Sequence, residues 1–207
     1  MISRTLIQVT AVVVSIVFVA GTLLTSGTAD TSFLRFFSVA VFAATIVIFA
    51  WDKWLWKLPV SQMVPSVARN VSGTWETCLE SMWVDPATGQ VINPKTVYVV
   101  IRQTSSQISV TLISNESKSK SAIARLVLED ASWILHYVYT NQPLLDLQHR
   151  SPIHHGSGVL EVVGNPARRI AGSYWTDRNS RGKLSLARRS AQLAEDFEDA
   201  LELFSHA

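Results

Sequence analysis

The sequence predicts a membrane protein in two parts. The first is an N-terminal two-helix transmembrane hairpin (residues 1–58), and the second is an all-β domain (71–189), an eight-stranded antiparallel up-and-down β-barrel with a short C-terminal amphipathic helix (190–207). Three observations lead to this prediction: two long uncharged runs near the N-terminus, alternating apolar and polar positions through the middle of the chain, and helical spacing at its end. Residues 59–70, which contain two prolines, are expected to be a linker.

The first uncharged run extends from Thr5 to Leu24. About 20 helical residues, at ~1.5 Å each, match the ~30 Å thickness of the hydrocarbon core of a bilayer. The second run covers residues 33–50 and is followed by tryptophans mixed with lysines (51–57), a combination typical of the headgroup boundary. The sequence therefore predicts membrane spans at about residues 5–24 and 33–50.

The distribution of basic residues predicts how these spans are oriented. Arg4 precedes the first span, and the second is followed by Lys53, Lys57 and Arg69. The connecting turn carries Asp30, with Arg35 at its edge. Cytoplasmic loops are enriched in lysine and arginine, so both termini and the β-domain are expected on the cytoplasmic side. A cleavable signal peptide, with a small-residue site at Gly27–Ala29, is the alternative interpretation of the first run.

The middle of the chain has the period of two that is typical of half-buried strands. Strands are expected at residues 73–80, 95–103, 107–114, 120–129, 132–140, 158–163, 168–176 and 182–189. Asp85–Gly89 is expected to form a turn, and most later connections are as short as antiparallel hairpins require. Eight such strands can close into a barrel with room for one small ligand, and a two-sheet sandwich is the alternative.

The last segment has the spacing of an amphipathic helix. Leu193, Phe197, Leu201 and Phe204 form one apolar stripe, and acidic residues cover the other faces. The stripe can pack on its own domain or contact a neighbouring subunit, and the sequence leaves both alternatives open.

No motif for catalysis or metal binding stands out. Cys78 is the single cysteine, so an intrachain disulfide and a cysteine-based metal cluster are excluded. His154 and His155 are adjacent, so on an extended chain they point to opposite sides, and no partner has ligand spacing. A nucleophile elbow and a phosphate-binding glycine loop are also missing from the sequence. We therefore expect no enzymatic activity, no metal and no cofactor.

The charge of the β-domain indicates a phosphorylated ligand. Residues 69–189 contain 14 lysines and arginines and nine aspartates and glutamates, a net charge of about +5. Basic residues follow aromatic ones, as in Tyr98 with Arg102 and Tyr174 with Arg178. Aromatic faces stack on nucleobases, and guanidinium groups pair with phosphates. The candidate ligand-binding residues are Trp75, Thr77, Tyr98, Arg102, Ser119, Ser121, Tyr174, Thr176, Arg178 and Arg188.

Each candidate also has a purely structural interpretation. Trp75 can be a residue of the barrel floor, covered by Arg188, and Arg102 can be an exposed strand position. Around residues 98–103 and 170–176 both strand faces mix polar and apolar side chains, so the period of two does not decide which face lines the lumen.

Two patterns in the sequence resemble known families. Gly73-x-Trp75 resembles the first strand of lipocalin and fatty-acid-binding barrels. The two N-terminal runs, the segment RQTSSQISVTLISNESKSKS (102–121) and the closing segment GSYWTDRNSRGKLSLARR (172–189) resemble a more particular family. It is the two-transmembrane, β-strand-rich effector family of bacterial CBASS antiphage systems, encoded beside a CD-NTase (SMODS) nucleotide cyclase. The resemblance covers nearly the whole chain.

The resemblance implies a receptor and effector. A cognate CD-NTase would make a cyclic dinucleotide, the cytoplasmic barrel would bind it, and the transmembrane helices would then form a homo-oligomer that disrupts the bacterial inner membrane and causes abortive infection. Under this hypothesis Trp75, Tyr98 or Tyr174 stacks on a base, and Arg102 or Arg178 meets a phosphate. No DNA or RNA polymer is expected as a partner. The alternatives are a membrane-tethered lipocalin-like barrel for a lipid or other hydrophobic ligand, and a membrane scaffold without a ligand.

Overall fold

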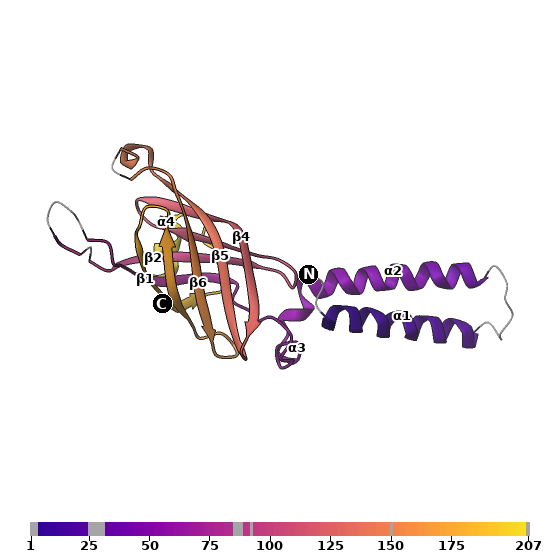
Figure 1. The fold of residues 1–207 in the computed structure, drawn as a ribbon. Helices are drawn as coiled ribbons and strands as arrows, with labels where there is room; N and C mark the ends of the chain where they lie inside the picture. Colours follow the sequence, from indigo (N-terminus) through magenta and orange to yellow (C-terminus); the bar gives the residue numbers. More distant parts are fainter. Residues whose placement is uncertain (1–3, 25–31, 85–88, 92, 150, 206–207) are drawn as a thin grey trace. The chain divides into compact units, whose positions relative to one another are not determined.

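The chain folds into two compact units (Figure 1). The computed structural model describes residues 4–24, 32–84, 89–91, 93–149 and 151–205. The first unit comprises Met1–Val67 together with Thr104–Ser106, and the second comprises Ala68–Gln103 and Gln107–Ala207.

Helices form most of the first unit. They are α1 (Arg4–Leu24), α2 (Ser32–Lys53), the 3-10 turn η1 (Leu55–Lys57) and the four-residue helix α3 (Pro59–Gln62). Pro59 stands at the first position of α3, where a helix needs no backbone N–H. Asp52 at the end of α2 accepts hydrogen bonds from the backbone N–H and the hydroxyl of Ser106, at 2.9 and 2.7 Å.

The prediction of a transmembrane hairpin is wrong. Both helices form over the expected ranges, but no helix in the described part of the chain is long and apolar enough to cross a membrane. The prediction counted uncharged residues, and such a count includes polar ones such as Gln8 and Ser15. In the second run the apolar part, Phe36–Ala50, is about 22 Å long as a helix, less than the ~30 Å of the hydrocarbon core. Gly27–Ala29, the alternative cleavage site, lies outside the described residues.

Eight antiparallel strands form the second unit and close into a barrel in which each strand pairs with the next and β8 pairs with β1 (Figure 1). The strands are β1 (Gly73–Ser81), β2 (Lys95–Gln103), β3 (Ile108–Ile113), β4 (Ser117–Glu129), β5 (Ser132–Pro143), β6 (His154–Val163), β7 (Arg169–Thr176) and β8 (Arg181–Ser190). The predicted eight-stranded barrel is thus present, in the predicted order, and the two-sheet sandwich is not. Residues 85–88 of the predicted turn lie outside the described residues.

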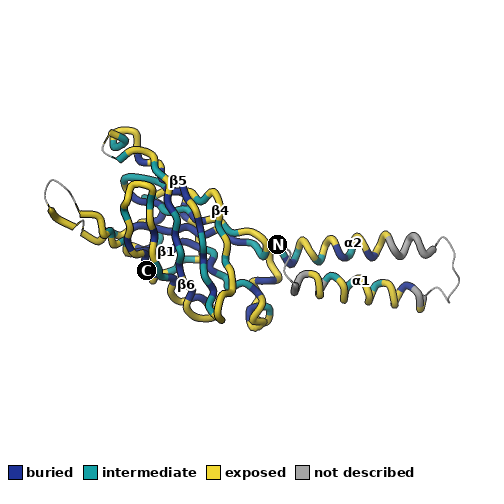
Figure 2. The backbone as a smooth tube through the Cα atoms, in the orientation of Figure 1, coloured by how far each residue is buried: buried dark blue, intermediate teal, exposed yellow. Residues whose placement is uncertain are grey.

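One end of the barrel is filled by an apolar core. Figure 2 shows that buried positions lie along the barrel strands. Trp75 lies at its centre, fully buried, and its indole N–H donates to the carbonyl of Val71 at 2.9 Å. The guanidinium carbon of Arg189 lies 5.4 Å from the centroid of the indole ring. Trp75 is therefore a residue of the barrel floor, and Arg189 covers it in place of the expected Arg188.

The C-terminal helix packs on the outer face of its own barrel. It is shorter than expected, because α4 spans Phe197–Ser205 and the residues before it form a strap along β1. The hydroxyl of Thr74 donates to the carbonyl of Gln192 and accepts from the N–H of Ala194. Phe204 then stacks on Tyr98, with the ring centroids 5.7 Å apart. Of the two alternatives for this helix, the structure shows packing within one chain.

Candidate functional site: a cavity in the barrel

A cavity of about 890 Å³ occupies the barrel end that is not filled by the core. It lies where β1, β3, β5 and β7 end and where β2, β4, β6 and β8 begin. Its deeper wall is apolar and includes Leu79, Val97 and Leu184, while polar side chains gather nearer the strand ends. An antiparallel barrel sends every second side chain inward, so each strand contributes to this wall at alternate positions.

Three tyrosines, together with Trp83, supply the aromatic surface of the cavity. Tyr137 and Tyr139 come from β5, with ring centroids 5.7 Å apart, and Tyr174 comes from β7. All three are mostly buried, and this burial raises the pKa of each phenol above its ordinary value of 10.0. The phenols therefore stay neutral and keep a proton to donate, so they can bind an anionic ligand without repelling it.

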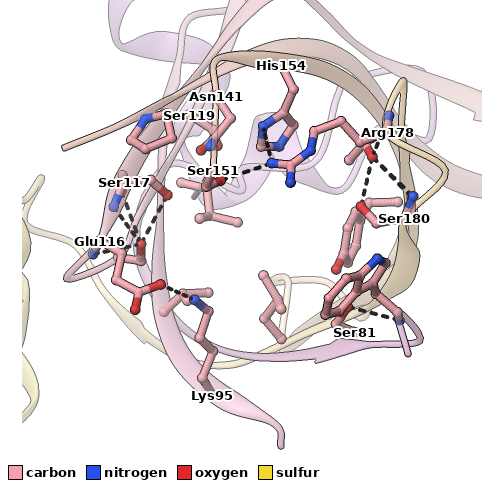
Figure 3. A pocket seen from close by; sticks show the side chains of 18 of the residues that line it. Ser81, Lys95, Glu116, Ser117, Ser119, Asn141, Ser151, His154, Arg178 and Ser180 are labelled. Carbon is pink, nitrogen blue, oxygen red and sulfur yellow. Dashed lines mark hydrogen bonds and ion pairs between the residues drawn. The ribbon is translucent and has the colours of Figure 1, made fainter. Parts of the chain in front are cut away.

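Two cationic side chains reach the cavity at different places (Figure 3). Lys95, at the start of β2, lies 3.2 Å from the carboxylate of Glu116. Arg178, in the turn between β7 and β8, donates to the hydroxyl of Ser151 at 2.9 Å and lies 3.5 Å from Nδ1 of His154. Figure 3 shows the Arg178 guanidinium extending over the cavity and the Lys95–Glu116 pair on another side.

Small hydroxyl groups complete the polar wall. The buried Ser119 on β4 donates to the side-chain carbonyl of Asn141 at 2.7 Å. The hydroxyl oxygens of Thr176 and Ser180 lie 2.7 Å apart. These groups can both donate and accept, so they suit the mixed edge of a nucleobase or a ribose better than a hydrocarbon chain.

Four of the ten predicted ligand-binding residues line the cavity: Ser119, Tyr174, Thr176 and Arg178. Three others point into the barrel but lie outside the cavity wall. Trp75 belongs to the core, the Thr77 hydroxyl donates to the carbonyl of Trp75, and the Ser121 hydroxyl accepts from the N–H of Val110. Their side chains serve the fold at these positions.

The remaining three candidates lie on the outer face of the barrel. Tyr98 packs against α4, and Arg102 is exposed. Arg188 donates to Glu76 and to the carbonyl of Phe204, so it holds α4 to the barrel. None of these three lines the cavity.

Several cavity residues were not predicted. The most informative are Lys95, Glu116, Tyr137, Tyr139 and His154. The two tyrosines could have been found, because they follow Trp133 and Leu135 at a spacing of two. Glu116 and His154 lie at strand ends, where the period of two carries no information.

The architecture defines the class of protein: an up-and-down barrel, filled at one end and hollow at the other, of the kind that can hold one small ligand. Among the described residues, no group of three His, Cys, Asp or Glu side chains could hold a metal ion. The cavity is the candidate ligand site of this barrel.

Comparison with known proteins identifies the family. Residues 66–188 match the model of "Cap15, cyclic dinucleotide receptor domain", and the chain belongs to this family. The chain is also similar to the CD-NTase-associated protein 15 of Staphylococcus schleiferi, with 28% identity over 149 residues, or 72% of this chain and 76% of that protein. These matches confirm the predicted membership of the CBASS effectors and a cyclic dinucleotide as the class of ligand. The family is a receptor family and not a catalytic one.

Proposed function

We propose that one cyclic dinucleotide, made by a cognate CD-NTase, binds in the barrel cavity and switches the chain to an assembled state that disrupts the bacterial inner membrane. The observation that carries this proposal is the pair of cations, Lys95 and Arg178, at two places on a cavity of about 890 Å³ with three neutral tyrosines. In infected cells this switch would stop growth before phage are released.

The chemistry of the ligand matches the wall. A cyclic dinucleotide has two phosphates, each with one negative charge, and two bases. Arg178 has a planar guanidinium that pairs with two phosphate oxygens at once, whereas Lys95 acts as a point charge for the second phosphate. Tyr137, Tyr139 and Tyr174 offer rings for base stacking and hydroxyls for base acceptors. The volume of the cavity lies within the ~300–1,000 Å³ of typical small-molecule sites.

A lipid or other hydrophobic ligand suits this wall less well. An acyl chain would remove Lys95, Glu116 and Arg178 from water and return no hydrogen bonds, and burying a charged group in this way is costly. The polar groups that make the site favourable for a dinucleotide therefore act against the lipocalin-like alternative. A filled, ligand-free scaffold is disfavoured by the cavity itself.

The output is proposed to come from α1 and α2. Their described side chains expose large apolar groups, among them Ile16 at 62%, Phe42 at 68% and Leu23 at 78%. An exposed apolar surface of this kind marks an interaction site. We propose that the same helices of other copies cover it in the assembled state, at the inner membrane. The ligand can drive this change only if it binds the assembled state more tightly than the resting state.

Thermal unfolding of the full chain with a panel of 3′,3′-linked cyclic dinucleotides of adenine, guanine and uracil tests the receptor function. A ligand at 100 times its Kd stabilises the folded state by about 2.7 kcal/mol, so one panel member is expected to raise Tm by several degrees. If no member changes Tm, the proposal is wrong for these ligands.

The effector step needs a separate measurement. The full chain is mixed with dye-loaded vesicles of bacterial lipid, and the ligand that raised Tm is added. We expect dye release only after ligand addition, and clearly less release from Arg178→Ala when the ligand is added at about the Kd of the parent protein. Release that does not depend on ligand would contradict the proposed switch.

A further inference from the structure

Strand β4 extends beyond the strand beside it. β3 pairs with β4 only where Thr111–Ile113 lie opposite Lys118–Lys120, whereas β5 pairs with β4 from Ser117 to Glu129. Within the described residues, positions 123–129 of β4 therefore have ladder partners on the β5 side alone. An unpaired strand edge presents backbone N–H and C=O groups to which another strand can be added.

The hairpin turn shows which backbone groups point to this free edge. Asp130 and Ala131 have φ values of 43° and 66°, as in a two-residue type I′ turn, and Glu129 lies opposite Ser132. In such a hairpin the flanking pair exchanges its hydrogen bonds, and bonded and non-bonded pairs then alternate along the strands. Leu128 and Leu126 therefore direct their backbone N–H and C=O groups away from β5, toward the free edge.

The side chains along this edge leave apolar surface uncovered. Ile123 is 63% exposed, Leu128 44% and Val127 36%. Arg125 and Glu129 lie on either side of Val127 on the same outward face. The edge thus combines free backbone groups, exposed apolar side chains and two opposite charges at a spacing of four residues.

We propose that the free edge of β4 is a self-association surface, at which the β4 strand of a second copy of this chain pairs in antiparallel orientation, centred on Val127. The sheets of two barrels then become continuous across the pair. The β4 contact would form part of the assembled state, and in this respect it rests on the proposed function. The features that define the surface belong to β4 alone.

The charges select the register. With a two-fold axis at Val127, Arg125 of each copy lies opposite Glu129 of the other, so the same ion pair forms twice. Leu126 then lies opposite Leu128, and these are the residues whose backbone groups point to the free edge, as a hydrogen-bonded pair requires. Within each copy a ring nitrogen of His136 lies 3.1 Å from the Glu129 carboxylate. In the proposed pair this same carboxylate meets Arg125 of the other copy.

Other registers lack this match. An axis at Leu126 places Arg125 opposite Val127 and leaves Glu129 opposite Ile123, so both charges lose their partners. An axis at Arg125 places two arginines opposite each other, which is destabilising. Shifting the axis beyond Val127 shortens the pairing, because the turn at Asp130 begins there.

Disulfide crosslinking of the full chain tests the contact. In a Cys78→Ser background, Val127→Cys places two thiols at a non-bonded antiparallel pair, where Cα atoms are about 4.5 Å apart and a disulfide can form. Val138→Cys is the matched control, because Val138 is 45% exposed on the outward face of β5, a strand that is paired with β4 on one side and with β6 on the other. Oxidation with and without the cyclic dinucleotide panel is expected to give a covalent dimer of Val127→Cys at least fivefold above the control in one of the two conditions. If Val127→Cys and Val138→Cys give equal dimer yields both with and without the ligand panel, the proposal is overturned.

Charge exchange tests the register. In the Val127→Cys protein, Arg125→Glu and Glu129→Arg are each expected to lower the dimer yield several-fold, and the double exchange is expected to restore it. A double exchange that stays as low as the single variants overturns the register centred on Val127. The ligand-induced rise in Tm of Arg125→Glu is measured in parallel. Arg125 lies outside the cavity. If Arg125→Glu fails to dimerise but shows a normal ligand-induced rise in Tm, the result concerns this surface alone. If the parent protein shows no rise in Tm, the result concerns the proposed receptor function.

Discussion

Tyr137 on β5 lies directly opposite Gly158 on β6, and a methyl group at this glycine would come within 2.4 Å of the tyrosine ring. The next inward pair repeats the arrangement, with Tyr139 opposite Gly156 and the same 2.4 Å approach. The absence of a side chain on β6 lets both rings lie against the wall of the barrel. The hollow end of the barrel therefore depends on glycines that are not themselves part of the cavity wall.

Gly158→Ala is expected to push the Tyr137 ring into the cavity. Overpacking of this kind costs about 1–3 kcal/mol of unfolding free energy, and the displaced ring should also weaken ligand binding. Urea unfolding and ligand titration measure the two effects. In a Tyr137→Ala background the same substitution should cost clearly less, because the clashing ring is gone. An equal cost in both backgrounds would contradict the proposed role of the glycine.

Arg178→Ala is expected to lower the affinity for the cyclic dinucleotide about 10- to 100-fold. A hydrogen bond to a charged group contributes about 1.5–3 kcal/mol, and 1.4 kcal/mol corresponds to a factor of ten. Arg102→Ala is the matched control: it removes the same charge from the exposed outer face, and it should change the affinity less than twofold. Calorimetric titration of both variants measures the difference, and similar losses would place the phosphate contact elsewhere.

The Lys95–Glu116 pair predicts two effects of opposite sign. Both side chains are about 40% exposed, so the pair is partly screened by water and its energy is modest. Glu116→Gln removes a negative charge from the cavity and should raise the affinity for a dianionic ligand about two- to fivefold. Lys95→Gln should lower it by a similar factor. Titrations at low and high salt should show the difference shrinking as salt rises, and a loss of affinity in both variants would contradict this account.

Alkaline pH should destabilise the barrel through its buried phenols. Burial raises the pKa of Tyr137 and Tyr139 above 10.0, so the unfolded chain releases these protons first as the pH rises. The stabilising contribution is complete below pH 10 and is lost above it, by up to about 1.4 kcal/mol per pH unit for each phenol. Urea unfolding near pH 8 and near pH 10.5 measures the loss. The double variant Tyr137→Phe/Tyr139→Phe should lose less, and an equal loss would assign the effect to other groups.

Most of the β-domain could be predicted from the sequence because its strands have one buried and one exposed face. Alternation along β5 is clear, with Trp133 and Leu135 buried and Val138 exposed. The short hairpin connections then determine the order of the strands. The strand ends were less predictable: β6 begins at His154 and not at residue 158, so that the Pro- and His-rich loop is shorter than expected.

The site was harder to predict because β2 has no exposed face at its centre. Residues 97–101 are all buried: Val99 and Ile101 face the barrel core, while Tyr98 and Val100 lie under α4. The alternation that would assign Tyr98 to the outside is therefore hidden by a helix nearly 100 residues away in the sequence. The same helix explains why Arg188 lies on the outer face: its guanidinium donates to the carbonyl of Phe204 in α4. The basic and aromatic composition of the β-domain had instead suggested that Arg188 binds the ligand.

Phe204→Ala is expected to release α4 from the barrel. Phe204 is 7% exposed, stacks on Tyr98 and lies under the Arg188 guanidinium at 5.3 Å, and removing a buried phenylalanine costs about 3 kcal/mol or more. Leu201→Ala on the same helix is the control, because its side chain is 45% exposed and should cost less than about 1 kcal/mol. Hydrogen exchange of α4 and of β2 measures both variants. Since Tyr98 is outside the cavity, the ligand affinity of Phe204→Ala should stay within about twofold of the parent protein. A large loss of affinity would show that the outer face of β2 is coupled to the ligand site.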